Sequence, residues 1–161
     1  MAQVIVAPSS KIDLIDLEPY KWKLSRKYPT ISSEDFEILD LEYRRFLLLK
    51  TMYPNTKFSP TRNMDEMWHQ HILDTSNYRK NCQQLFGKFL DHRPYFGPHS
   101  PDGLWESMSH KFDTMEEIYT QVFGDSPSAD LDIFIEKAVR RSFCNDGGVP
   151  GETCDEGDGC E

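Results

Sequence analysis

The sequence predicts an all-α protein, an irregular helical bundle of about four main helices around a long central helix, with an extended N-terminal arm. In four segments, apolar side chains recur three and four residues apart, which is the period of an amphipathic helix. Serines precede these segments and glycines follow two of them, as is typical of helix ends. The 161 residues suffice for one domain with a core of its own.

The central helix is expected from Pro60 to Gly87, because proline suits the first helical position and glycine the position after the last. One face of this helix carries a row of apolar and polar side chains: Met64, Trp68, His71, Thr75, Tyr78 and Cys82. Asp65 and His69 lie one turn apart on a different face. The rest of the chain is expected to cover or approach this helix.

Three further helices are expected from their apolar stripes, at Glu34 to Met52, Leu104 to Phe123 and Ala129 to about Phe143. Near the N-terminus, the short apolar runs Val4 to Val6 and Ile12 to Leu17 indicate a short strand or an extended arm. We therefore expect a single helical domain over residues 1–143. Residues 144–161, rich in glycine and acidic side chains, are expected to form a disordered tail.

The net charge of -9 argues against a general nucleic-acid-binding protein, which needs a concentrated positive surface. The tail carries six acidic side chains and no basic one, so most of the charge belongs to it. No apolar run approaches the length of a membrane span, and the N-terminus lacks a secretory signal. We therefore expect a cytoplasmic protein that meets an unknown protein or small-molecule partner and no membrane.

Two histidines on the central helix, His69 and His71, invite a metal-site interpretation. Residues two apart on a helix point about 200° apart, so these two imidazoles cannot hold one ion on an unbroken helix. His71 shares its face with apolar and hydroxyl side chains, which favours a structural role. His69 is the better ligand candidate, because Asp65 precedes it by four residues and can either chelate the same ion or orient the imidazole.

Further ligands would come from the loop over residues 88–103, which contains His92 and His99. To reach His69, either histidine would have to return along almost five helical turns, ~27 Å, which uses most of the loop. If His92 instead meets the end of the helix, its neighbours are Tyr78 and Cys82, and Cys82 with His92 becomes either a soft metal site or a thiol and base pair.

The candidate metal ligands are accordingly Asp65, His69, His71, His92 and His99, and the candidate catalytic residues are Tyr78 and Cys82. Zinc, iron and copper all accept such ligands, and the sequence does not choose among them. A buried polar cluster without any ion is the structural alternative.

The stretch from Asp65 to Gly87, with the pattern DxxWHxH, then TxxYxxxC and a final FG, resembles the glycine-rich domain-containing protein family. The resemblance extends over about Tyr43 to Phe123. It implies that five residues belong to the family pattern: Asp65, Trp68, His69, Tyr78 and Cys82. It implies no settled activity.

Three interpretations of function follow from these observations. The first is a metal-binding or metal-dependent enzymatic domain that uses the central helix and the loop histidines. The second is a non-catalytic interaction module in which the same motif is structural. The third is a protein whose tail cysteines, Cys144, Cys154 and Cys160, are modified by a partner enzyme.

Overall fold

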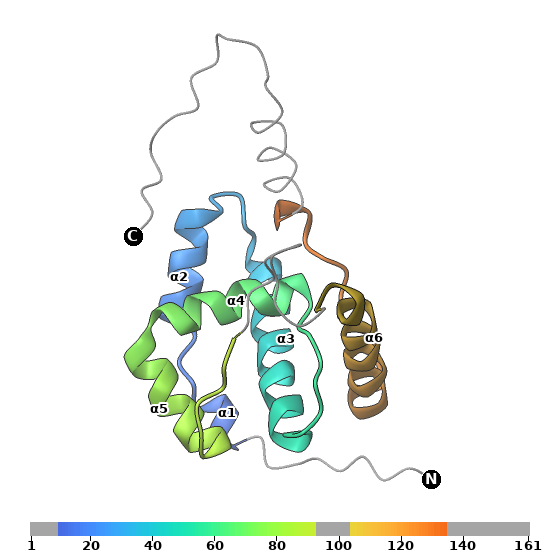
Figure 1. Cartoon of the computed structure of the whole chain (residues 1–161). Helices are drawn as coiled ribbons and strands as arrows, with labels where there is room; N and C mark the ends of the chain where they lie inside the picture. The colour runs from blue at the N-terminus through green and yellow to red at the C-terminus, as the bar shows by residue number, and fades with distance from the viewer. Residues whose placement is uncertain (1–9, 93–103, 135–161) are drawn as a thin grey trace, which may run out of the picture.

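The computed structural model describes residues 10–92 and 104–134, and this part of the chain is a bundle of helices with no strand (Figure 1). The prediction of an all-α fold is therefore confirmed. In chain order the helices are α1 Ser10–Asp13, α2 Glu18–Lys27, α3 Ser33–Met52, α4 Arg62–Leu73, α5 Thr75–Phe86 and α6 Leu104–Phe123. A helical turn at 132–134 follows them. None of the described helices has the length and apolar character needed to cross a membrane.

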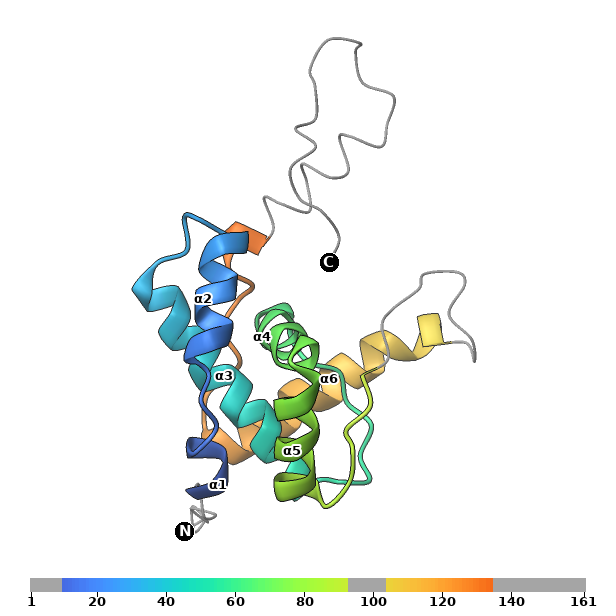
Figure 2. The same ribbon diagram turned by 90° about the vertical axis from the view of Figure 1, so that its left-hand side faces the viewer.

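Helix α3 lies in the middle of the fold, where it packs chiefly against α4 and also contacts α1 and α6 (Figures 1 and 2). It begins with a capping box, since the Ser32 side chain accepts from the Asp35 amide and the Asp35 carboxylate accepts from the Ser32 amide. Its buried face supplies large apolar side chains to the core: Leu39, Tyr43, Phe46, Leu47 and Leu49. The helices expected over 34–52 and 104–123 are both confirmed.

The expected single central helix over 60–87 is wrong, because the chain breaks at Asp74 into α4 and α5. Asp74 has φ -85° and ψ 69°, and its carboxylate accepts from the Asn77 amide at 3.3 Å and the Asn77 side chain at 2.7 Å. The Tyr20 hydroxyl of α2 donates to the same carboxylate at 3.1 Å. A side-chain cap from within and a hydrogen bond from another helix thus outweigh the continuous apolar period.

The expected extended arm is also corrected where it is described, since residues 10–13 and 18–27 are helical. Ile12 and Ile15 are buried, and the Arg44 guanidinium of α3 donates to both of their carbonyl groups, at 2.6 and 3.1 Å. These contacts hold the N-terminal segment against α3. The run Val4 to Val6, most of the helix expected over 129–143, and the tail lie outside the described residues.

A buried polar cluster holds the start of α4 in place. Glu42 of α3 is 2% exposed and accepts from the Ser128 amide at 2.6 Å and from the Asn63 side chain at 3.3 Å. Asn63 also donates to the Ala129 carbonyl at 3.0 Å and accepts from the Leu131 amide at 3.0 Å. Burial raises the pKa of Glu42. The cluster ties the segment after α6 to α3 and to the first turn of α4.

The link between α3 and α4 is held by a partly buried lysine. The Lys50 ammonium donates to the Phe58 carbonyl at 3.0 Å and lies 3.7 Å from the centroid of the Phe58 ring and 5.4 Å from that of Phe46. Burial lowers the pKa of Lys50 to about 8. Phe46 of α3 also packs against Trp68 of α4, with ring centroids 5.0 Å apart. This contact helps to hold α4 against α3.

Replacing Asp74 tests the break. Asp74→Ala removes the cap of α5 and the acceptor for Tyr20, so we expect the free energy of unfolding to fall by about 1–2 kcal/mol in urea denaturation. The matched control is Ser76→Ala, an exposed position in the first turn of α5, which should change stability by less than about 0.5 kcal/mol. Equal stability of Asp74→Ala and the parent would show that the cap does not maintain the break.

The lowered pKa of Lys50 predicts a stability difference that depends on pH. Below pH 8 the amine is charged in both the folded and the unfolded chain, and folding carries the full desolvation cost. As the pH rises from about 8 to 10.5, the folded protein loses this proton first, so the parent should gain stability relative to Lys50→Met. The pKa shift from 10.5 to about 8 limits this gain in stability to about 3 kcal/mol. The side chain is only partly buried, so the gain is smaller than this limit. Denaturation of both proteins from pH 7 to 10.5 checks this, and a constant difference would contradict it.

Candidate metal centre

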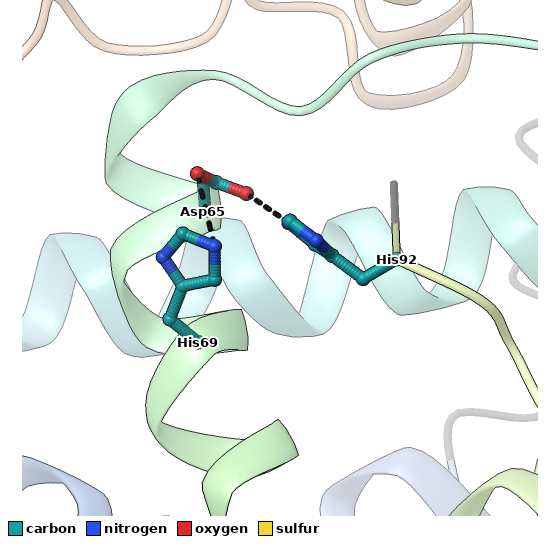
Figure 3. Close-up of side chains that lie close together, drawn as sticks. All are labelled: Asp65, His69 and His92. Atoms are coloured by element: carbon teal, nitrogen blue, oxygen red, sulfur yellow. Dashed lines mark hydrogen bonds and ion pairs between the residues drawn. The ribbon is translucent and has the colours of Figure 1, made fainter. Parts of the chain in front are cut away.

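Three potential metal ligands meet on the outer side of α4 (Figure 3). Asp65 lies in the first turn of α4 and His69 one turn later, while His92 comes from the segment that follows α5. The start of α4 is held by Thr61, whose hydroxyl accepts from the Met64 amide at 3.3 Å. Two of the three side chains therefore sit on one rigid helix at the spacing that places them on the same face.

The Asp65 carboxylate lies between the two imidazoles. One carboxylate oxygen is 2.9 Å from Nε2 of His92, and the other is 3.6 Å from Nε2 of His69. The ring centroids of the two histidines are 4.6 Å apart. One ligand atom from each residue can be chosen so that all three lie within 4.8 Å of one another. Among the described residues, no other group of three such side chains has this geometry.

The centre is open to solvent on one side. The His92 side chain is 13% exposed, that of Asp65 33% and that of His69 43%. His92 forms the covered side because its ring packs edge-on against Trp68, with centroids 4.6 Å apart. Trp68 is itself only 5% exposed. His69 is thus the most exposed of the three side chains, and His92 is the most covered.

His92 reaches α4 within a few residues, where the expected straight helix required a return over five turns. Because the chain breaks at Asp74, α5 leaves α4, and the segment after α5 runs back towards α4 (Figures 1 and 2). The reversal occurs at Gly87, whose φ of +67° ends α5 in the left-handed conformation. Five residues beyond it bring His92 beside Asp65.

Tyr78 and Cys82, the candidate catalytic residues, lie beneath the centre and do not face solvent. They are 1% and 2% exposed. The Tyr78 hydroxyl accepts from Trp68 Nε1 at 2.9 Å and donates to the Leu90 carbonyl at 2.6 Å. Burial raises the pKa of Tyr78. His92 pairs with Asp65, so the alternative pair of His92 with Cys82 is not what the structure forms. His99 lies outside the described residues.

His71 points away from the centre, into the core, where it is 1% exposed. Its Nδ1 is 2.8 Å from the Tyr43 hydroxyl, and its Nε2 is 2.9 Å from the Asn81 side-chain amide. The rings of Tyr20 and Tyr78 also pack against it, with centroids 5.0 Å away. Burial lowers the pKa of His71 to about 4, so the imidazole is neutral at pH 7. The structure thus places it as a core residue and apart from the other metal candidates.

Several residues that shape the centre were not predicted. Asp74 carries a sequence signal, because the run LDTSN contains four residues that favour helix ends, although the apolar period continues through it. Trp68 was placed on the correct helix, yet its contact with His92 depends on the path of the chain after α5. Asn81 and Leu90 act through tertiary contacts for which no spacing in the sequence gives a signal.

A family model described as UCP032817-like matches residues 12–111, which is more than half of the chain. No curated protein and no solved structure matches the sequence. The family match corrects the expected resemblance to the glycine-rich domain-containing protein family. The motif from Asp65 to Gly87 that suggested this resemblance lies inside the matched residues.

His69 and His71 should differ in how much each contributes to the free energy of unfolding. His71→Ala leaves a buried cavity and removes two hydrogen bonds, so we expect the free energy of unfolding to fall by about 2–4 kcal/mol in urea denaturation. His69→Ala changes a partly exposed side chain and should cost less than about 1 kcal/mol. The interpretation of His71 as structural fails if the two variants are equally stable.

Proposed function

The chain belongs to the UCP032817-like family, and we propose that it binds a divalent transition metal ion at Asp65, His69 and His92 for metal-dependent chemistry. The observation that carries the proposal is the convergence of one carboxylate and two imidazoles, with ligand atoms within 4.8 Å of one another. A single ion with bonds of about 2.0–2.2 Å to each ligand would fit among atoms at such separations after small side-chain rotations.

The donor set narrows the class of metal. Two imidazole nitrogens with one carboxylate are typical of zinc, iron(II) and copper sites, whereas magnesium and calcium prefer oxygen ligands. Structural zinc sites use four protein ligands, and catalytic sites keep a position free for water or substrate. Among the residues that the structure describes, three ligands meet beside α4, and this number supports a site of the second kind. A metal bound there would supply a Lewis acid or an activated water.

A non-catalytic interaction module is the second candidate. It is favoured by the contacts that the Asp65 carboxylate makes with both imidazoles, and by exposed apolar side chains elsewhere. Trp22 of α2 is 66% exposed and Leu73 at the end of α4 is 61% exposed, and a protein partner would cover such residues. The third interpretation, modification of the tail cysteines, concerns residues outside the described part of the chain.

Metal content decides between the first two candidates. We expect the tag-free protein, purified without chelators, to contain close to one zinc, iron or copper per chain by plasma mass spectrometry. Deletion of residues 144–161 should leave this value unchanged, which removes the tail thiols from the count. Asp65→Asn keeps the shape of the side chain but loses its charge, and should weaken metal binding at least about tenfold.

The matched control is Asp91→Asn, because Asp91 is an exposed carboxylate next to His92 that lies outside the group of three. This variant should bind metal as the parent does. The proposal is overturned if the parent takes up none of the three metals on reconstitution, or if Asp65→Asn binds as tightly as Asp91→Asn. Either result would leave the interaction module as the better account.

A further inference from the structure

We propose that Tyr78 is the positioning residue of the metal centre, and that its hydroxyl places His92 by holding the Leu90 carbonyl. This inference deepens the proposed function and rests on it, because it concerns how the third ligand is brought to Asp65 and His69. Tyr78 does not touch the ion or its open face in this account. It acts through the backbone two residues before His92.

His92 lies on the short segment that follows α5. Residues 88–92 follow α5 outside any helix, so no regular backbone hydrogen bonds fix them. In the described part of the chain, two hydrogen bonds join this segment to the helices, one from Tyr78 to the Leu90 carbonyl and one between His92 and Asp65. The second of these involves the ligand atoms themselves. The first is therefore the anchor that remains when the ligands turn to an ion.

The Tyr78 hydroxyl has two hydrogen-bond partners, which together fix its direction. The indole nitrogen of Trp68 can only donate, so at 2.9 Å it occupies an acceptor position on the Tyr78 oxygen. The single phenolic proton is then directed to the Leu90 carbonyl, 2.6 Å away. Because the hydroxyl is buried, water does not compete for either bond. His92 follows Leu90 by two residues, so its backbone stays within about 7 Å of the carbonyl that Tyr78 holds.

Trp68 connects the Tyr78 hydroxyl to the His92 imidazole. Trp68, which orients the Tyr78 hydroxyl, also packs edge-on against the His92 ring at an interplanar angle of 72°. One side chain of α4 thus braces both the anchor and the ligand. His92 is limited by the Leu90 anchor behind it and by the Trp68 ring beside it, and its Nε2 is left facing Asp65. Without the hydrogen bond from Tyr78 to Leu90, His92 would have to be ordered when the ion binds, and this ordering would cost free energy.

The test compares Tyr78→Phe with Tyr119→Phe. Each substitution removes one buried hydroxyl, since both tyrosines are 1% exposed, and Tyr119 bonds to Arg45 away from the His92 segment. Two readouts are needed. The first is the ring-current shift of the His92 resonances by Trp68 in the metal-free protein, by NMR. The second is cobalt(II) binding, followed by its visible absorption and dissociation constant.

For Tyr78→Phe we expect the His92 resonances to move towards their unshifted positions and cobalt(II) to bind about tenfold more weakly with an altered visible spectrum. Tyr119→Phe should match the parent in both readouts. A Tyr78→Phe protein that matches the parent in both overturns the positioning role. If Tyr78→Phe does not fold, an ester in place of the Leu90–Asp91 amide is tested instead, because it weakens the Leu90 carbonyl as an acceptor and leaves Trp68 in place, and the same outcomes apply.

Failure of the two proposals can be told apart. If the parent binds no cobalt(II), the metal function fails, and the metal-free NMR comparison still decides whether Tyr78 places His92. If the parent binds cobalt(II) and Tyr78→Phe is unchanged, the metal function stands and the positioning role is wrong.

Discussion

The break of the chain at Asp74 is the constraint on which the rest of the structure depends. On a straight helix, α5 would continue the axis of α4 and carry the following segment ~27 Å away from His69. The cap at Asp74 turns α5 aside, and the left-handed residue Gly87 then reverses the chain. Because of these two local features, a ligand that is 27 residues from Asp65 in the sequence lies 2.9 Å from it in space.

The same helix geometry assigns opposite roles to two neighbouring histidines. His69 and His71 leave α4 about 200° apart, so one faces solvent and the other faces α3. In the core, a charged imidazole would be costly, and His71 remains neutral between Tyr43 and Asn81. At the surface, His69 keeps its ring nitrogen available beside Asp65. One turn of helix thus contributes both to the stability of the fold and to the chemistry proposed for its surface.

Much of the fold could be predicted from the sequence, because α3 and α6 each carry an apolar stripe, α3 begins at a serine cap and Gly124 follows α6. The pairing of Asp65 with His69 also followed from local spacing. The break at Asp74 was missed because the apolar period continues across it, while its hydrogen bond to Tyr20 comes from a distant helix. The place of His92 depended on that break, so the error in one element carried into the site. The roles of Tyr78 and Leu90 depend on contacts that no spacing encodes.

If Asp65, His69 and His92 bind an ion as proposed, their origin connects metal binding to folding. Asp65 and His69 are set by α4 alone, and two ligands on a helix give only weak chelation. The third arrives only when α4, α5 and the segment after Gly87 are packed together. An ion that needs all three ligands therefore binds the folded chain and not the unfolded one. By mass action, such an ion at 100 times its dissociation constant would stabilise the fold by about 2.7 kcal/mol. Trp68 links the two events, because it bonds to Tyr78 of α5 and also packs against His92.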